Sequence, residues 1–277
     1  MKKIAPIFLF TVLLSLISCE EVINVDLDTA PAKLVIDASI DWEKGTPGTT
    51  QIIKLTTTTG YYSNVVPSVS GATIFIRSDV SNVIFNFNEE VPNSGLYVCT
   101  TFAPIIGETY RLTVIQAGET YEASEKMIPV PSIIETNTSQ RDDAGFGLNE
   151  IEVKFFFQDD GQENNSYLTK STTPINVLPE YFAFDDRYAQ GNEMFGLYTN
   201  KDLKPGDAIE FCLYGISKQY FNYMRILLAN AGTSNGSPFQ TPPATVRGNI
   251  INQTNESNYC LGYFRLSEVD KFQYIVQ

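Results

Sequence analysis

The chain has 277 residues, of which 43% are hydrophobic, so it is long and apolar enough to bury one large or two medium-sized cores. Acidic residues outnumber basic ones by 32 to 19, and the net charge of -13 disfavours a nucleic-acid partner because phosphate backbones would be repelled. The sequence has no histidine, which excludes Ser-His-Asp and Cys-His nucleophiles, HExxH zinc sites and an imidazole general base.

The N-terminus has the features of a secretory signal. The pair Lys2-Lys3 precedes a largely apolar run, 4–17, that is too short for a permanent transmembrane helix. Leu16-Ile17-Ser18-Cys19 resembles a lipoprotein signal, with a small residue directly before the cysteine that would begin the mature chain. We predict a lipoprotein signal peptide over 1–18, lipidation of Cys19 and an outer-membrane anchor formed by this lipid. The alternative is an ordinary signal in which the cysteine is incidental.

Two acidic residues, Glu20 and Glu21, directly follow Cys19. Acidic residues at this position resemble the signal by which Bacteroidota export lipoproteins to the cell surface. The alternative is a solvated start of the mature chain, with the protein facing the periplasm. We expect a lipid-anchored outer-membrane protein that is exposed at the surface.

A short motif follows a few residues later. Asp28-Thr29-Ala30 resembles the Asp-Thr/Ser-apolar acceptor of Bacteroidota protein O-glycosylation, so Thr29 is a candidate O-glycosylation site. A three-residue motif also occurs readily by chance.

From Ile23 onward, apolar and polar residues alternate with the period of half-buried strands. The segments with this pattern are 23–27, 34–40, 51–58, 72–77, 83–87, 96–99, 110–116 and 121–126. Turn-forming runs such as Pro92-Asn93-Ser94-Gly95 separate them. Many short strands, each with one apolar face, predict an immunoglobulin-like β-sandwich over residues 19–130.

Pro129-Val130-Pro131 marks the predicted end of this domain, because proline fixes φ and removes a hydrogen-bond donor. Residues 131–277 are predicted to form a second β-rich domain with one helix near 218–231. Ser217 can cap this helix and Gly232 can end it. We expect the helix to pack on the core; a partner helix is the alternative. Its strands are expected at 151–157, 167–172, 208–217, 246–251, 259–267 and 272–276.

Short motifs in a fixed order resemble a known family. They include Lys33-Leu34-Val35-Ile36-Asp37, Phe184-Asp185-Asp186, Lys204-Pro205-Gly206-Asp207, Tyr220-Phe221-Asn222-Tyr223 and Leu261-Gly262-Tyr263-Phe264. Together they resemble a Bacteroidota outer-membrane lipoprotein family of unknown function (domain of unknown function four-two-four-nine). Genes of this family are often found beside those of TonB-dependent receptors. The resemblance therefore implies an accessory lipoprotein of such a receptor, and it implies no catalytic residues.

Adjacent carboxylates are the remaining route to chemistry without histidine. Neighbouring residues on a strand point to opposite faces, so a pair such as Glu89-Glu90 or Asp142-Asp143 does not automatically converge on a substrate. The run 159–165 is rich in oxygen ligands, but it lacks the EF-hand order, so we interpret it as an acidic hairpin tip rather than a Ca²⁺ site. We predict no catalytic residues, no metal and no cofactor.

A cluster of aromatic residues and carboxylates occurs in the second half of the chain. Aromatic faces beside carboxylates suit sugar rings, which makes this cluster a candidate ligand site. The alternative is that the aromatic residues fill the second core while the charges lie in a turn. The candidate residues are Tyr181, Phe184, Asp185, Asp186 and Tyr188.

Three cysteines remain after Cys19, and an exported protein would meet an oxidising compartment. Cys212 and Cys260 lie in predicted strands of one domain, so they are the candidate pair for a disulfide. Buried free thiols are the alternative.

The leading hypothesis is a non-enzymatic outer-membrane lipoprotein that serves a TonB-dependent receptor as an accessory or ligand-capture partner. One alternative is a surface glycan-binding protein. Another, less favoured, is a carboxylate-dependent hydrolase.

Overall fold

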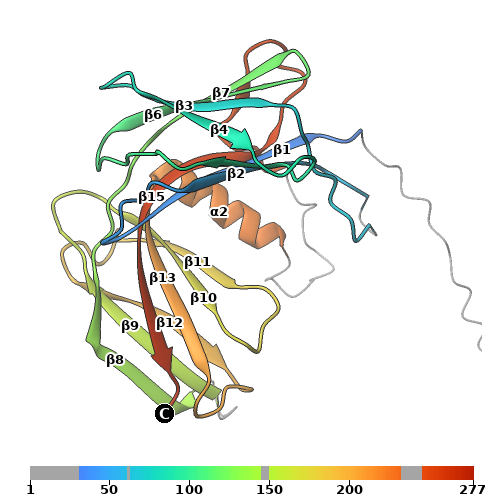
Figure 1. Ribbon diagram of the computed structural model, residues 1–277. Helices are drawn as coiled ribbons and strands as arrows, with labels where there is room; N and C mark the ends of the chain where they lie inside the picture. The colour runs from blue at the N-terminus through green and yellow to red at the C-terminus, as the bar shows by residue number, and fades with distance from the viewer. Residues whose placement is uncertain (1–30, 61–62, 145–149, 232–244) are drawn as a thin grey trace, which may run out of the picture. The chain divides into compact units, whose positions relative to one another are not determined.

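A computed structural model describes residues 31–60, 63–144, 150–231 and 245–277, which are mainly β with one helix (Figure 1). The mainly β fold predicted from the sequence is confirmed. The predicted signal segment 1–18, Cys19, Glu20, Glu21 and Thr29 lie outside these residues, so their roles stay predictions. In the described part of the chain, no helix has the length and apolar character needed to cross a membrane.

The first seven strands form the expected immunoglobulin-like β-sandwich. One layer contains β1, β2 and β5, and the other contains β3, β6 and β7; β4 pairs with both β5 and β3 and so joins the layers. Alternate residues such as Ile36, Ile53, Ile74 and Leu112 meet in the first core. The strands are β1 (Leu34–Glu43), β2 (Gln51–Thr57), β3 (Thr73–Ser78), β4 (Ile84–Glu89), β5 (Leu96–Cys99), β6 (Thr109–Gln116) and β7 (Glu119–Lys126).

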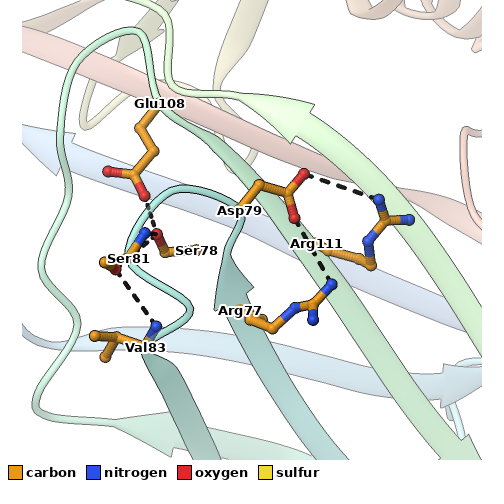
Figure 2. A network of polar contacts seen from close by, with 7 residues as sticks. All are labelled: Arg77, Ser78, Asp79, Ser81, Val83, Glu108 and Arg111. Atoms are coloured by element: carbon orange, nitrogen blue, oxygen red, sulfur yellow. Dashed lines mark hydrogen bonds and ion pairs between the residues drawn. The ribbon is translucent and has the colours of Figure 1, made fainter.

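A polar network fixes the turn between β3 and β4 (Figure 2). The Ser78 hydroxyl donates to the buried carboxylate of Glu108 and accepts from the backbone and side chain of Ser81 at 2.8 and 2.7 Å. Beside it, Asp79 lies 3.9 Å from Arg77 and 3.8 Å from Arg111. The two arginines are direct cross-strand neighbours, so Asp79 offsets a repulsion between like charges.

The last strand, β15 (Leu261–Ile275), belongs to both halves of the chain. Its first part runs parallel to β1, from Val35–Leu261 to Glu43–Val269, and its last part pairs antiparallel with β13 (Ala208–Ile216). Residues near the C-terminus also complete the first core: Ile250, Cys260, Phe264 and Leu266. The short strand β14 (Ile251–Asn252) pairs with β7.

These pairings correct the predicted domain boundary. The chain does leave the first sandwich at Pro129-Val130-Pro131, between β7 and β8. However, 131–277 is not one consecutive domain, because parts of 250–269 are built into the first sandwich. A pairing between strands more than 200 residues apart leaves no local signal in the sequence.

The second sandwich packs two layers around an aromatic core of Phe155, Phe157, Phe211 and their neighbours. One layer contains β10, β11, β13 and the end of β15, and the other is the three-stranded sheet of β8, β9 and β12. The new strands are β8 (Ile133–Ala144), β9 (Glu150–Gln158), β10 (Ser166–Thr172), β11 (Glu180–Asp185) and β12 (Glu193–Asn200).

The predicted helix is present as α2 (Lys218–Asn230). Ser217 caps it as expected, with its side chain accepting from the Tyr220 backbone N–H at 3.2 Å. Tyr220, Phe221 and Met224 are buried, and the helix covers the face of the β10–β13–β15 layer that lies away from the aromatic core. The helix ends at Asn230 with Ala231 as its C-cap, and the predicted stop at Gly232 lies outside the described residues.

Candidate ligand-binding groove

The aromatic cluster predicted on β11 does not form one site. Phe184 points into the second core, where its ring centroid lies 6.1 Å from that of Phe157 and 5.8 Å from that of Tyr167. Tyr181 lies on the opposite, helix-covered face of the strand. Tyr188 is 93% exposed in the turn after the strand. The strand period thus separates residues that are neighbours in the sequence.

The two carboxylates of this cluster have separate partners. Asp186 is buried and accepts from the Asn165 backbone N–H at 2.6 Å, which ties two loops together. Asp185 lies 2.5 Å from Lys218 and 3.1 Å from Arg187. Burial opposes ionisation of Asp185, but the hydrogen bonds and positive charges of Lys218 and Arg187 outweigh it and lower its pKa. Both carboxylates therefore have structural partners.

The acidic run 159–165 is organised by Asp159, which is 2% exposed. Its carboxylate accepts from the Tyr167 hydroxyl at 2.5 Å and from the Gly191 backbone N–H at 2.7 Å. Among the described residues, no group of three or more acidic or cysteine side chains is arranged to hold a metal ion. Asp159 joins two loops of the second sandwich.

The candidate disulfide between Cys212 and Cys260 is absent from the structure. Both are buried free thiols, as is Cys99. Cys212 lies under the helix and is paired in register with Lys271, whereas Cys260 lies in the first core just before β15 begins. At roughly 3.3 Å per residue along β15, on the order of 30 Å separates them, far beyond the reach of a disulfide.

A groove between α2 and the underlying sheet is the strongest candidate for a functional site. Its volume is about 520 Å³, within the range of about 300–1,000 Å³ for small-molecule sites. The floor is formed by β1, β10, β11, β13 and β15, and the wall by the helix. The sequence prediction included only Tyr181 of its lining.

Tyrosines supply much of the surface of the groove. On the helix side, the Tyr220 ring stacks on Tyr223 with centroids 5.8 Å apart, and both contact Tyr263 of β15 at 4.8 and 4.9 Å. Tyr181 and Tyr214 complete the set from the sheet. Tyr220, Tyr263 and Tyr214 are buried, whereas Tyr181 is 39% exposed and Tyr223 is half-buried. Tyr181 and Tyr223 are therefore the partly exposed tyrosines of the groove, and Tyr181 also lines the neighbouring hollow between β11 and β12.

Arg265 lies in the floor and is only 5% exposed. Its Nη2 donates to Asp41 at 2.5 Å, while Nε and Nη1 have no hydrogen-bond partner among the described residues. The rings of Tyr214 and Tyr220 lie 5.0 and 5.3 Å from the guanidinium carbon. Burial opposes the charge of Arg265, but the Asp41 carboxylate outweighs it and raises the pKa, so the guanidinium stays protonated.

The alternation of buried and exposed residues along β1 explains which of them line the floor of the groove. Ile36, Ala38 and Ile40 point into the first core, so the residues between them line the groove. The groove-lining residues of this strand are Val35, Asp37, Ser39 and Asp41. The Ser39 hydroxyl donates to Asp37 at 2.8 Å. Lys170 of β10 adds a positive charge on the other side.

Sequence reasoning missed Arg265, Asp37 and Asp41. A signal was present, because an arginine inside the apolar run Tyr263-Phe264-Arg265-Leu266 is unusual for a buried strand. Nothing local showed that β1 and β15 are neighbours.

A second hollow of about 350 Å³ lies between β11 and β12, which are the edge strands of their sheets. Phe182, Phe195 and Leu197 line it and are 64%, 47% and 44% exposed. Among the described residues that line it, only Glu180 is charged.

Several solved structures are distantly similar to this chain. A cytokine receptor complex (crystal form 1A) shares 6% identity, with 65% of this chain and 82% of that chain covered, at a TM-score of 0.26. A two-domain fibronectin type III segment of chicken tenascin shares 14% identity, with 66% of this chain and 90% of that chain covered, at a TM-score of 0.21. The FN1–FN3 domains of chicken CNTN1 share 12% sequence identity, with 67% of this chain and 59% of that chain covered, also at a TM-score of 0.21. Scores this low support no argument about function.

Comparison with sequences is decisive for the family. No curated protein matches the chain significantly. A family model described as "Domain of unknown function (DUF4249)" matches residues 20–273, nearly the whole chain beyond the predicted signal. The likeness seen in the sequence motifs is thereby confirmed, and this protein belongs to the DUF4249 family.

Proposed function

We propose that this protein is a non-enzymatic, lipid-anchored outer-membrane protein that captures a ligand for a TonB-dependent receptor. The observation that carries the proposal is the groove beneath α2, where accessible tyrosine rings lie beside a buried arginine with unused hydrogen-bond donors. Such a combination of aromatic surface and a few polar groups is typical of binding sites.

The chemistry of the reactive side chains favours binding over catalysis. The sequence contains no histidine. Burial raises the pKa values of the Cys212 and Cys260 thiols to about 11, so both are protonated and poorly nucleophilic at neutral pH. The groove offers hydrogen-bond donors, acceptors and rings, which suffice to hold a ligand without transforming it.

The lipoprotein motif at Cys19 supports the membrane anchor, and the family resemblance supports the receptor as partner. Two measurements on cells test these parts separately. Labelling with an alkyne fatty acid should mark the wild-type protein and leave Cys19→Ala unmarked, with the variant lost from the outer-membrane fraction. Purification from solubilised outer membranes should recover a β-barrel receptor with the wild type.

Failure to label the wild type would overturn the anchor. Repeated recovery of the protein without a β-barrel receptor would overturn the partnership. Cys99→Ala is the matched control for labelling, because Cys99 is a buried thiol of the first core and should not carry lipid.

A further inference from the structure

Arg265 is incompletely satisfied in the floor of the groove. Of its three nitrogens, only Nη2 has a hydrogen-bond partner among the described residues. Leaving two nitrogens of a buried guanidinium without acceptors costs free energy, so such an arrangement is expected where another molecule supplies the missing acceptors. Because Nε and Nη1 are covered by protein atoms, the ligand must also displace neighbouring side chains slightly.

The charges around the groove balance. Its lining includes two carboxylates, Asp37 and Asp41, and two cationic side chains, Lys170 and Arg265. An anionic ligand that approached Arg265 would also meet both carboxylates, and a cationic one would meet both basic groups. A ligand with neutral groups that donate and accept together avoids both repulsions.

Hydroxyl groups have this dual character. Each can donate to the carboxylate of Asp37 or Asp41 and accept from Lys170 or Arg265. The partly exposed rings of Tyr181 and Tyr223 provide apolar surface against which the C–H groups of a sugar ring can pack. A neutral sugar thus matches the charge balance, the hydrogen-bonding groups and the rings of the same groove.

We propose that the groove beneath α2 binds a neutral sugar ring, as part of an oligosaccharide, through Asp37, Asp41, Arg265 and the tyrosines. This inference rests on the proposed ligand-capture function and names its ligand class. It places the sugar away from the turn that holds Tyr188.

The test is calorimetric titration of the full-length protein in detergent with four neutral hexasaccharides: maltohexaose, cellohexaose, laminarihexaose and mannohexaose. At least one should bind. Tyr181→Ala removes an accessible ring, and Asp37→Asn removes a carboxylate from an exposed position, so the fold should persist in both. Each should raise the Kd about tenfold, the effect of losing one good contact.

Tyr188→Ala is the matched control, because it removes a tyrosine that is 93% exposed and outside the groove. It should leave the Kd unchanged. Equal Kd values for the wild type, Tyr181→Ala and Asp37→Asn would overturn the location. Unfolding curves of each variant separate loss of binding from loss of fold.

Trigalacturonate and the dipeptide Ala-Phe are the charged probes. If either bound at the groove while all four neutral sugars did not, the ligand class would be wrong but ligand capture would stand. If no neutral hexasaccharide bound, the inference would fail, whereas lipid labelling and receptor recovery would still decide the proposed function independently.

Discussion

Gly262 lies directly against the backbone of Ile36, its partner in the parallel pairing of β1 and β15. A Cβ atom on Gly262 would come within 2.0 Å of the Ile36 carbonyl oxygen, and the glycine has a φ of +97°. We expect Gly262→Ala to destabilise the protein by about 2–5 kcal/mol, because it combines a strained φ with a backbone clash. Chemical denaturation measures this.

Gly206 provides the control, since it has a similar φ of +95° but nothing within 4 Å of the Cβ position. Gly206→Ala should lower the free energy of unfolding only by the cost of the strained φ, about 1–2 kcal/mol. Equal losses in the two variants would mean that the β1–β15 contact is less close than described.

Asp159→Asn should destabilise the second sandwich. The substitution removes a buried charge that accepts hydrogen bonds from Tyr167 and Gly191, and charged hydrogen bonds contribute about 1.5–3 kcal/mol each. Asp160→Asn changes the adjacent, exposed carboxylate and should be nearly neutral. If calcium stabilised the wild type and neither variant, the interpretation of this run as a structural turn would be wrong.

Glu125 should make stability depend on pH in an unusual direction. Burial raises its pKa above the ordinary 4.5, despite hydrogen bonds from Lys126, Ser217 and Tyr263. A raised pKa in the folded state means that its contribution is fully present below pH 4.5 and is lost as the pH rises through the folded-state value. Glu125→Gln should therefore gain stability relative to wild type as the pH rises from 4 to 7.

Glu119 is the opposite case. Hydrogen bonds from Tyr121 and Asn258, with burial opposing them, lower its pKa. Its contribution is present above pH 4.5 and is lost on acidification, so Glu119→Gln should cost most at neutral pH. Denaturation curves at pH 4 and pH 7 measure the stability of Glu119→Gln and Glu125→Gln relative to wild type. If this relative stability changed with pH in the same direction for both variants, the opposite pKa shifts of the two carboxylates would be contradicted.

Arg265→Met should cost little stability, or add some, because a buried charge with one acceptor is replaced by an apolar side chain of similar length. Asp41→Ala should be the more harmful change, since it leaves the buried guanidinium without its ion-pair partner; because the Asp41 side chain is 42% exposed, we expect the loss to stay below the about 3–5 kcal/mol of a fully buried pair. Thermal melts of both variants show which of the two substitutions lowers the melting temperature more. The reverse order would mean that Arg265 serves the fold rather than the groove.

Local patterns predicted much of this fold. The alternation in 34–40 placed Ile36, Ala38 and Ile40 on the buried face, and Ser217 marked the start of the helix correctly. Three strands escaped prediction, β8, β11 and β12, partly because the outward face of β12 carries Phe195 and Leu197 where alternation would place polar residues.

The site was harder to predict than the fold. Tyr181 and Phe184 were grouped because they are close in sequence, but the strand turns them to opposite faces. The groove instead depends on β1 and β15, which meet across more than 220 residues. Arg265 acquires its partner Asp41 only through that pairing.

The shared strand has a consequence for how the protein is made. Val269 is paired with Glu43 on one side and Tyr214 on the other, so β1 acquires its β15 neighbour only after more than 220 further residues have been synthesised. During synthesis the N-terminal sandwich would remain open at one edge until β15 has been made. A premature stop before Leu261 would leave that edge uncovered, and the truncated product should aggregate or be degraded rather than persist as a half-protein.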